Sequence, residues 1–370
     1  MQQYFIVLAD NLLEVIMKKK GFIVIGCLFI AIMVIAGVTV FRQKKLSTAP
    51  TAYYIIYSDM LKKNGGVTGI DISGNPTFIK SLKIQDVSKY NLMEQDFIAG
   101  GSRANNHLII DENGSVSEFY LLDNPDYSGV TAITGDKENI IAVMNGNITN
   151  NTYQNLFVIQ DKKNNILEKE VFDIYASDIL LSDNIVYIVG SYLNEEKDQW
   201  SSKIIQYSMK TKDVKEKVIS KDRDYKKVLL YKNQLYCMVG DMNGKISEID
   251  ILDRNSLDRI DTQILNKEIS AFFCDNNFLY YVLNNTLYKM ENDENMIELL
   301  DLLENTYVSS SIMKNNHIYI FCRKNVTKKE RGKTDLGTII DYDIANNTSQ
   351  STPIKLENKV YDDVIFFPAL

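Results

Sequence analysis

Histidine and cysteine, the side chains that most often bind metals or act as nucleophiles, are few in this chain and widely spaced. The two histidines are His107 and His317, and the cysteines beyond the N-terminal segment are Cys237, Cys274 and Cys322. Three is an odd number, and no CxxC or neighbouring histidine accompanies them, so neither a disulfide framework nor a zinc site is indicated. We expect structural histidines and buried free thiols, and we predict no catalytic residue, no metal site and no cofactor.

Carboxylates could supply a second kind of chemistry. Asp241 and Asp275 lie near expected turns, and two carboxylates that face one another can act as general acid and base on a glycosidic bond. A hydrolase or lyase that acts on a cell-envelope glycan or peptide is therefore kept as an alternative function.

Two polar segments carry aromatic side chains suited to binding. Residues 145–154 include Tyr153, and residues 190–202 include Tyr192 and Trp200, the one tryptophan of the chain. An exposed tryptophan can anchor a protein partner or stack on a sugar ring. The alternative is that it covers an apolar groove.

A third segment, residues 323–337, concentrates positive charge. Six cations fall within residues 323–333, among them Arg323, Lys328, Lys329 and Arg331. Such a segment could bind lipid head groups, a wall polymer or an acidic partner, or it could be a solvated loop. The candidate binding residues are thus Tyr153, Tyr192, Trp200, Arg323, Lys328, Lys329 and Arg331.

The elements that must position these residues form a repeat. Short apolar runs of β type recur seven times, and their central residues are separated by 44, 44, 45, 49, 44 and 39 positions. A period of roughly 40–50 residues with strand-like content is typical of a β-propeller with one four-stranded blade per repeat. The central residues are Tyr54, Ile98, Ala142, Tyr187, Tyr236, Tyr280 and Tyr319.

Each repeat predicts four strands, which we call a, b, c and d. In the fourth repeat they are residues 178–182, 185–189, 203–209 and 214–219, with a polar turn at Asp183 and Asn184. The b runs have little polar alternation, as expected of strands covered on both faces, whereas d runs such as residues 116–120 alternate. Clusters of Asp, Asn, Gly and Lys mark the c–d turns.

The two ends of the repeat predict how the ring closes. No a run precedes the first b run at residues 53–57, and an eighth a-type run appears at residues 363–367. We predict an all-β, seven-bladed propeller of four-stranded antiparallel blades, in which this C-terminal strand completes blade one. Six or eight blades stay open, because the second repeat at residues 91–123 is hard to align.

The c–turn–d pattern, seen in residues 69–75 and 248–253, resembles the bacterial propeller superfamily that includes quinoprotein-like and YVTN-type repeats. The resemblance covers about residues 50–370 and implies the architecture without a shared activity. The chain lacks the Gly-His and Trp-Asp pairs of WD-type repeats and the docking tryptophans of quinoproteins, and it does not carry the double glycine that kelch proteins have in each repeat.

In a blade of this strand order, the a–b and c–d turns lie on one face of the disc and the b–c and d–a connections on the other. All three candidate segments are b–c connections. Since function concentrates in variable loops on a rigid scaffold, we expect the binding site on the b–c face.

The N-terminal region predicts a membrane anchor. Residues 21–41 form a run of 21 uncharged residues, and at about 1.5 Å per residue such a helix reaches roughly 30 Å, the thickness of the hydrocarbon core. We predict a short cytoplasmic segment at residues 1–20, a transmembrane helix at 21–41, a linker at 42–51 and the propeller at 52–370. The alternatives are a signal peptide that starts at Met17 and a lipoprotein signal at Cys27.

Charge bears on topology and partners. Three basic residues flank each side of the anchor, and the added N-terminal amine favours a cytoplasmic N-terminus. We therefore expect a single-pass cell-membrane protein with its propeller outside the cytoplasm. Six of the 41 Lys and Arg and two of the 48 Asp and Glu precede Leu46, so from there 35 basic residues face 46 acidic ones, a net charge of −11. An acidic domain disfavours nucleic acid as a partner.

These observations favour a membrane-anchored extracytoplasmic propeller that binds a protein or an envelope component without catalysis. A second hypothesis is an accessory or assembly subunit of a membrane transport or secretion complex, because a single helix can pair with other membrane helices. The hydrolase or lyase is the third.

Overall fold

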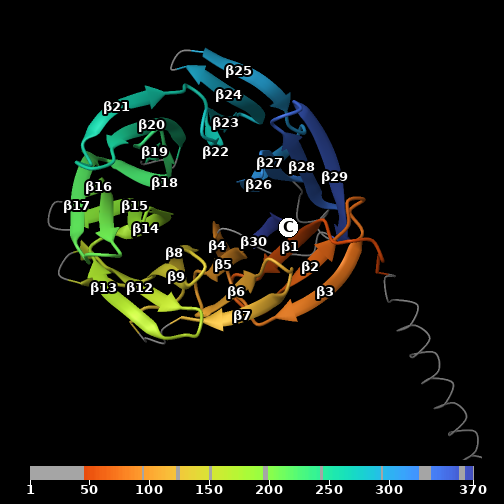
Figure 1. Ribbon diagram of the computed structural model, residues 1–370, viewed down its shortest axis with the longest axis horizontal. Helices are drawn as coiled ribbons and strands as arrows, with labels where there is room; N and C mark the ends of the chain where they lie inside the picture. The colour runs from red at the N-terminus through yellow and green to blue at the C-terminus, as the bar shows by residue number, and fades with distance from the viewer. Residues whose placement is uncertain are drawn as a thin grey trace, which may run out of the picture. The chain divides into compact units, whose positions relative to one another are not determined.

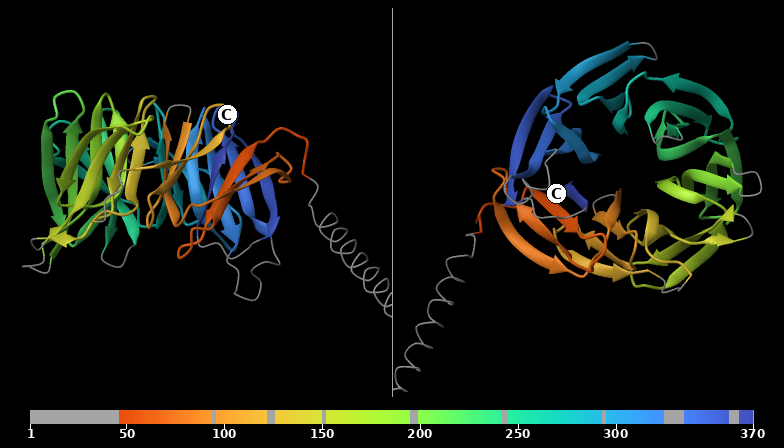
Figure 2. Two further views of the ribbon diagram at one scale, coloured as in Figure 1. Left: turned by 90° about the horizontal axis from the view of Figure 1, so that it is seen from below. Right: turned by 180° about the vertical axis from the view of Figure 1, so that it is seen from behind.

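The computed structural model describes residues 46–93, 96–121, 126–149, 152–194, 199–241, 245–292, 295–324, 335–357 and 363–369. The chain from Ser47 to Leu370 forms one compact unit. Its described residues contain seven four-stranded antiparallel sheets and one two-stranded hairpin. Figure 1 shows the seven sheets as blades around a central axis, and Figure 2 shows the strands running across the thickness of the disc. The predicted seven-bladed propeller is confirmed, and six or eight blades are excluded.

Each blade contributes one strand to each of four concentric positions. The inner, a strands are β30 (Asp363–Pro368), β4 (Val87–Met93), β8 (Val130–Gly135), β14 (Tyr175–Ser182), β18 (Arg223–Tyr231), β22 (Ile269–Cys274) and β26 (Thr306–Lys314). The b strands are β1 (Tyr53–Ser58), β5 (Asp96–Gly101), β9 (Asn139–Met144), β15 (Ile185–Asn194), β19 (Gln234–Asp241), β23 (Leu279–Leu283) and β27 (His317–Lys324). Every central residue of the sequence repeat lies in one of these b strands.

The outer half of each blade follows the same order. The c strands are β2 (Gly65–Ile70), β6 (Asn106–Ile110), β12 (Asn155–Asp161), β16 (Gln199–Ser208), β20 (Ile246–Asp253), β24 (Thr286–Asn292) and β28 (Asp335–Asp343). The rim, d strands are β3 (Pro76–Leu82), β7 (Val116–Tyr120), β13 (Ile166–Phe172), β17 (Val214–Lys221), β21 (Arg259–Ile264), β25 (Asn295–Asp301) and β29 (Thr348–Glu357). The extra hairpin joins β10 (Ile148–Thr149) to β11 (Thr152–Tyr153).

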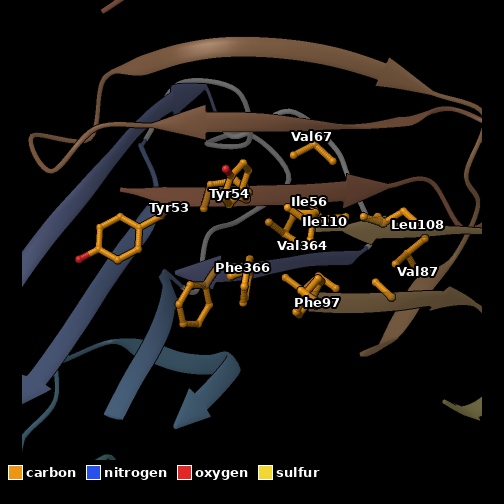
Figure 3. Packing of buried hydrophobic residues seen from close by; sticks show 14 of the residues in the cluster. Tyr53, Tyr54, Ile56, Val67, Val87, Phe97, Leu108, Ile110, Val364 and Phe366 are labelled. Atoms are coloured by element: carbon orange, nitrogen blue, oxygen red, sulfur yellow. The ribbon is translucent and has the colours of Figure 1, made fainter. Parts of the chain in front are cut away.

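Blade one is assembled from both ends of the described chain, as predicted. The sheet order is β3-β2-β1-β30, and β30 pairs with β1 from Tyr53↔Pro368 to Ser58↔Asp363. Phe366 of β30 is fully buried in a cluster that also contains Phe97 of blade two (Figure 3). Phe321 of blade seven belongs to the same cluster. The closing strand therefore joins three blades through one apolar core.

Short hairpin turns connect many of the strands. Consecutive residues with positive φ occur at Asp183 and Asn184, where φ is 52° and 61°, and at Asn315 and Asn316, where φ is 51° and 63°. Two successive positive φ values define a type I′ turn, which matches the twist of paired strands. Asp and Asn tolerate this conformation better than most residues, and the polar pair read from the sequence at Asp183 and Asn184 does form a turn.

A β-bulge interrupts six of the seven inner strands near the same point, since the pairing of each with its b strand shifts by one residue there. β30 pairs with β1 without such a shift. A bulge leaves one residue unpaired and redirects the strand. The residues at the bulge position are Ser88, Thr131, Ser177, Lys226, Ser270 and Ser309.

The predicted anchor at residues 21–41 and its flanks up to residue 45 lie outside the described residues. Among the residues that the structure describes, no helix has the length and apolar character that a membrane span requires.

Candidate functional site

The segment around Trp200 is a strand extension and not the loop that we predicted at residues 190–202. β15 and β16 are each ten residues long and stay paired as far as Leu193↔Trp200 and Asn194↔Gln199. The sequence hid this extension because Ser, Lys and Gln interrupt the apolar pattern at its tip. The extended blade-four hairpin is therefore held rigidly by ladder hydrogen bonds.

The predicted b–c loop of blade three also contains regular structure. Ile148 pairs with Tyr153 in the small β10–β11 hairpin, and the Tyr153 hydroxyl donates a hydrogen bond to Asn145 Oδ1. Gln154 Nε2 donates to Asp173 Oδ1 at 2.9 Å, which fixes the hairpin to the connection between blades three and four.

These two hairpins meet. The rings of Tyr153 and Tyr175 lie 5.0 Å apart at 70°, and β11 contacts β15. Lys203 places its ammonium 5.2 Å from the ring of Tyr192 and donates to Asp173 O at 3.0 Å. We call Tyr153, Tyr175 and Tyr192 the blade three–four surface; the Lys203 side chain that contacts Tyr192 is itself buried. Two predicted site residues, Tyr153 and Tyr192, thus come from neighbouring, contacting elements.

Trp200 lies on the other face of the blade-four hairpin. In an antiparallel pair, directly opposed residues share a face and successive residues alternate between faces. Trp200 opposes Leu193, whereas Tyr192 opposes Ser201. Trp200 is half-buried, and its carbonyl accepts a hydrogen bond from the Asp222 N–H at 2.8 Å, on the side of the next blade. The structure therefore separates Trp200 from Tyr192.

The basic segment of blade seven is described only in part. Arg323 belongs to β27, not to a loop, and its guanidinium lies 5.9 Å from the ring of Tyr307, the residue paired opposite it. Lys328, Lys329 and Arg331 lie outside the described residues.

A group that the sequence did not reveal lies at the centre of the ring. A cavity of about 440 Å³ is lined by inner strands of six blades, and we call it the central cavity. Its charged lining residues are Lys89, Asp178, Lys226 and Lys227. Lys226 is itself a bulge residue, and Lys89 and Asp178 directly follow the bulges of their strands. The adjacent lysines at 226 and 227 were the one signal that sequence reasoning could have used.

Hydrogen bonds hold part of this group in place. Asp178 Oδ2 accepts from the Val228 N–H at 3.0 Å, and Lys227 Nζ donates to Phe272 O at 3.1 Å. Lys226 forms an ion pair with Asp224. The bonds of Asp178 and Lys227 thereby link blades four, five and six to one another around the axis.

Burial dominates the electrostatics of the central cavity. It lowers the pKa of Lys227, against the opposing effect of Asp178, and it lowers the pKa of Lys89 in the same way. Burial also raises the pKa of Asp178, while Lys227 and the Val228 N–H act in the opposite direction. Burial raises the pKa of Tyr90 to about 12, so its hydroxyl keeps its proton, which it donates to Ser311 O at 3.2 Å. The charged forms of the two lysines and of Asp178 are thus under-solvated.

The residues that we considered for chemistry have other roles. Asp275 caps its own turn, accepting from the Asn277 and Phe278 N–H groups at 2.6 and 2.7 Å. Asp241 Oδ1 accepts from the Lys245 N–H at 2.9 Å, and Asp275 Oδ2 accepts from the Tyr280 hydroxyl. Neither aspartate lines the central cavity. The free thiols of Cys237, Cys274 and Cys322 come from three blades.

Comparison with known proteins identifies the fold class. No protein-family model and no curated protein matches the chain. The structure of apo AztD from Citrobacter koseri is similar over 87% of this chain and 99% of that one, with a TM-score of 0.50 and 11% identity. The streptogramin B lyase structure is similar over 86% and 95%, with a TM-score of 0.52 and 15% identity.

At such identities the likeness shows the fold alone. The chain is a seven-bladed β-propeller, and the architecture implied by the resemblance to bacterial propeller repeats is confirmed without a narrower family. This fold is compatible with a binding module, and the same scaffold serves unrelated functions.

Proposed function

We propose that this protein is a non-catalytic binding module, anchored in the cell membrane by residues 21–41, whose propeller lies outside the cytoplasm. It docks a protein or a cell-envelope component on its b–c face. The observation that carries the binding part of this proposal is the blade three–four surface, where two b–c hairpins of neighbouring blades contact one another.

Several properties of this surface suit a partner. Tyr175 is 41% exposed, and Tyr153 and Tyr192 are half-buried, so the rings are fixed on one side and accessible on the other. Tyrosine supplies large contact area with little loss of side-chain entropy and is enriched at binding hot spots. The ladder hydrogen bonds of β15 and β16 reduce the ordering that a loop would undergo on binding.

Site-specific photo-crosslinking in intact cells tests the docking part. We expect a crosslinker at position 175 of the full chain to give a discrete adduct, and Tyr192→Ala to reduce it by about 10-fold, as for an interface hot spot. A crosslinker at Thr211, in an exposed c–d turn of the opposite face, is the matched control. Equal labelling at positions 175 and 211 would count against docking on the b–c face.

Protease accessibility tests the membrane part separately. Sedimentation of the full chain with membranes, and digestion of the propeller from outside intact cells, are the expected results. A propeller protected until the cells are broken would overturn the proposed topology while leaving the crosslinking result valid.

The central cavity is the one observation that bears on the hydrolase or lyase alternative, since it gathers ionisable groups at one place. A glycoside hydrolase of the usual kind needs two carboxylates. Among the described lining residues, Asp178 is the one carboxylate, and lysines surround it. Binding is therefore the better-supported function of this propeller.

A further inference from the structure

The central cavity belongs to elements that the proposed docking surface does not use. Its lining comes from β4, β8, β14, β18, β22 and β26, at the axis of the ring. The cavity is open to solvent, since the side chain of Lys226, one of its lining residues, is 37% exposed. Its volume of about 440 Å³ lies in the range of small-molecule sites, about 300–1,000 Å³.

The charges that line the cavity do not balance. Asp224 and Asp86 also act on Lys89, but they form ion pairs with Lys226 and Arg103. Asp178 is therefore the one lining carboxylate left to balance Lys89 and Lys227. One positive charge is in excess, within a domain whose overall charge is strongly negative. In a partly buried site such an excess attracts an anion much more strongly than it would at the surface.

Hydrogen-bond donors are available for that anion. An ammonium has three donors, and Lys227 uses one of them on Phe272 O. The side chains of Lys89, Ser88 and Ser177 line the cavity and make no hydrogen bond to another described residue. Since Ser88 and Ser177 are bulge residues of β4 and β14, the repeat itself places hydroxyl groups beside the lysines.

Apolar side chains form a second part of the wall. Leu92, Leu180, Leu229 and Met313 line the same cavity and are partly exposed, alongside the polar residues Tyr90, Asn91 and Ser311. A ligand that suits both parts has one negative charge, which matches the excess of one, and an apolar body that fills the remaining volume. A doubly charged or fully polar anion would leave either a charge or the apolar wall unmatched.

We propose that the central cavity binds a small organic monocarboxylate, with its carboxylate on Lys89 and Lys227 and its apolar body against Leu180, Leu229 and Met313. The bound carboxylate supplies the missing negative charge. Its oxygen atoms also replace part of the water that solvates the two ammonium groups in the unfolded chain. This site is independent of the proposed docking function, and each can fail without the other.

Titration calorimetry with 2-naphthoate on the full chain tests the proposal. We expect saturable one-to-one binding, with affinity lower by about 10- to 100-fold in Lys227→Met and in Lys89→Met, as for a lost charged hydrogen bond. Lys163→Met removes the same charge from an exposed c–d turn and should leave the affinity unchanged. 2-Naphthylmethanol, which lacks the charge, should bind at least about 10-fold more weakly than the acid.

A gain-of-affinity variant guards against loss through misfolding. Asp178→Asn keeps an acceptor for the Val228 N–H but removes the competing carboxylate, so 2-naphthoate should bind about 10-fold more tightly. No heat of binding in either the wild type or Asp178→Asn would overturn the site. Equal affinities for the acid and the alcohol would overturn its anionic half, and inorganic phosphate binding as tightly as 2-naphthoate would overturn its apolar half.

Discussion

His107 shows how strongly a single side chain depends on its surroundings in this ring. It is fully buried on β6, and its ring lies 5.2 Å from that of Phe119. Nδ1 accepts a hydrogen bond from the Gly101 N–H at 3.1 Å, so the proton lies on Nε2, which has no partner among the described residues. Burial lowers the pKa of His107 to about 3. The ring is neutral in the folded protein because no counter-charge accompanies it.

We expect this histidine to make the protein less stable in mild acid. Below its ordinary pKa of about 6.5, the unfolded chain takes up a proton at His107 that the folded chain does not. The stabilisation that neutral His107 contributes is fully present above about pH 6.5. Below that pH the free energy of unfolding decreases by about 1.4 kcal/mol per pH unit, until the pH reaches the pKa of His107 in the folded protein.

Urea unfolding at several values between about pH 6.5 and pH 5 measures this slope. His107→Gln, which keeps an acceptor for the Gly101 N–H, should lose the slope whatever its stability at neutral pH. His317→Gln should retain it. An unchanged slope in His107→Gln would show that another group causes the acid sensitivity.

The lining of the central cavity marks the limit of sequence reasoning at this scale. Lys89, Asp178 and Lys227 lie in three different blades and meet because each follows or adjoins a bulge of an inner strand. A bulge changes which side of a strand faces the axis, and it leaves no fixed pattern in one sequence. The turn aspartates that we considered for chemistry were visible instead, since turns have compositional signals.

At the scale of elements, the closing strand β30 joins blades seven, one and two. Phe366 lies between blades, with its ring 6.0 Å from that of Phe321. Ser310 Oγ of β26 accepts a hydrogen bond from the Phe366 N–H at 3.3 Å, and Ser309 Oγ donates to Val364 O at 2.8 Å. The bulge of β26 thus places two hydroxyl groups against the backbone of β30.

Truncation of this strand's core residue should therefore be severe. We expect Phe366→Ala to lower the free energy of unfolding by about 3–5 kcal/mol, because it leaves a cavity where three blades meet. Ile79→Ala, on the rim strand β3 of the same blade and 55% exposed, should change it by less than about 0.5 kcal/mol. Guanidinium unfolding compares the two, and similar midpoints would mean that β30 contributes little to closure.

Strand prediction succeeded where burial leaves an apolar run and failed where it does not. All seven b strands are covered on both faces, and each was found from its apolar residues. The described end of the β15–β16 hairpin has polar residues, among them Ser201 and Ser202, between Tyr192, Leu193 and Trp200, so it was taken for a loop. Ladder pairing between two such segments can form without the apolar pattern that usually reveals it.

At the scale of the whole molecule, the first and last strands of the propeller, β1 and β30, pair in one blade. The Ala369 N–H donates to Ala52 O at 2.8 Å, which continues the ladder of β1 and β30 past their ends. Any opening of the ring at this seam must break a sheet and not only a contact between blades. The seam thus makes closure cooperative with the folding of blade one.

Circular permutation separates the effect of the seam from that of the blades. In both variants a short linker joins Ala369 to Ala52. New ends between Lys232 and Asn233 divide blade five, so that its a strand lies at the new C-terminus and its b, c and d strands lie at the new N-terminus. New ends between Asn266 and Lys267 leave every blade contiguous. We expect both to fold, and the second to unfold faster by about 10-fold or more, because no sheet then spans its ends. Stopped-flow unfolding that gives equal rates would show that contacts between blades suffice.

Because Tyr53 of β1 pairs with Pro368 of β30, blade one can be completed only after almost the whole propeller has been synthesised. At roughly 5–20 residues per second, a ribosome needs about 15–60 s to pass from β1 to β30. Throughout that interval β1, whose sequence is Tyr-Tyr-Ile-Ile-Tyr-Ser, has an unpaired edge, and such an edge can template aggregation. The yield of this protein in a cell therefore depends on how fast it is translated and on which chaperone covers its first strand, as well as on the stability of the finished ring.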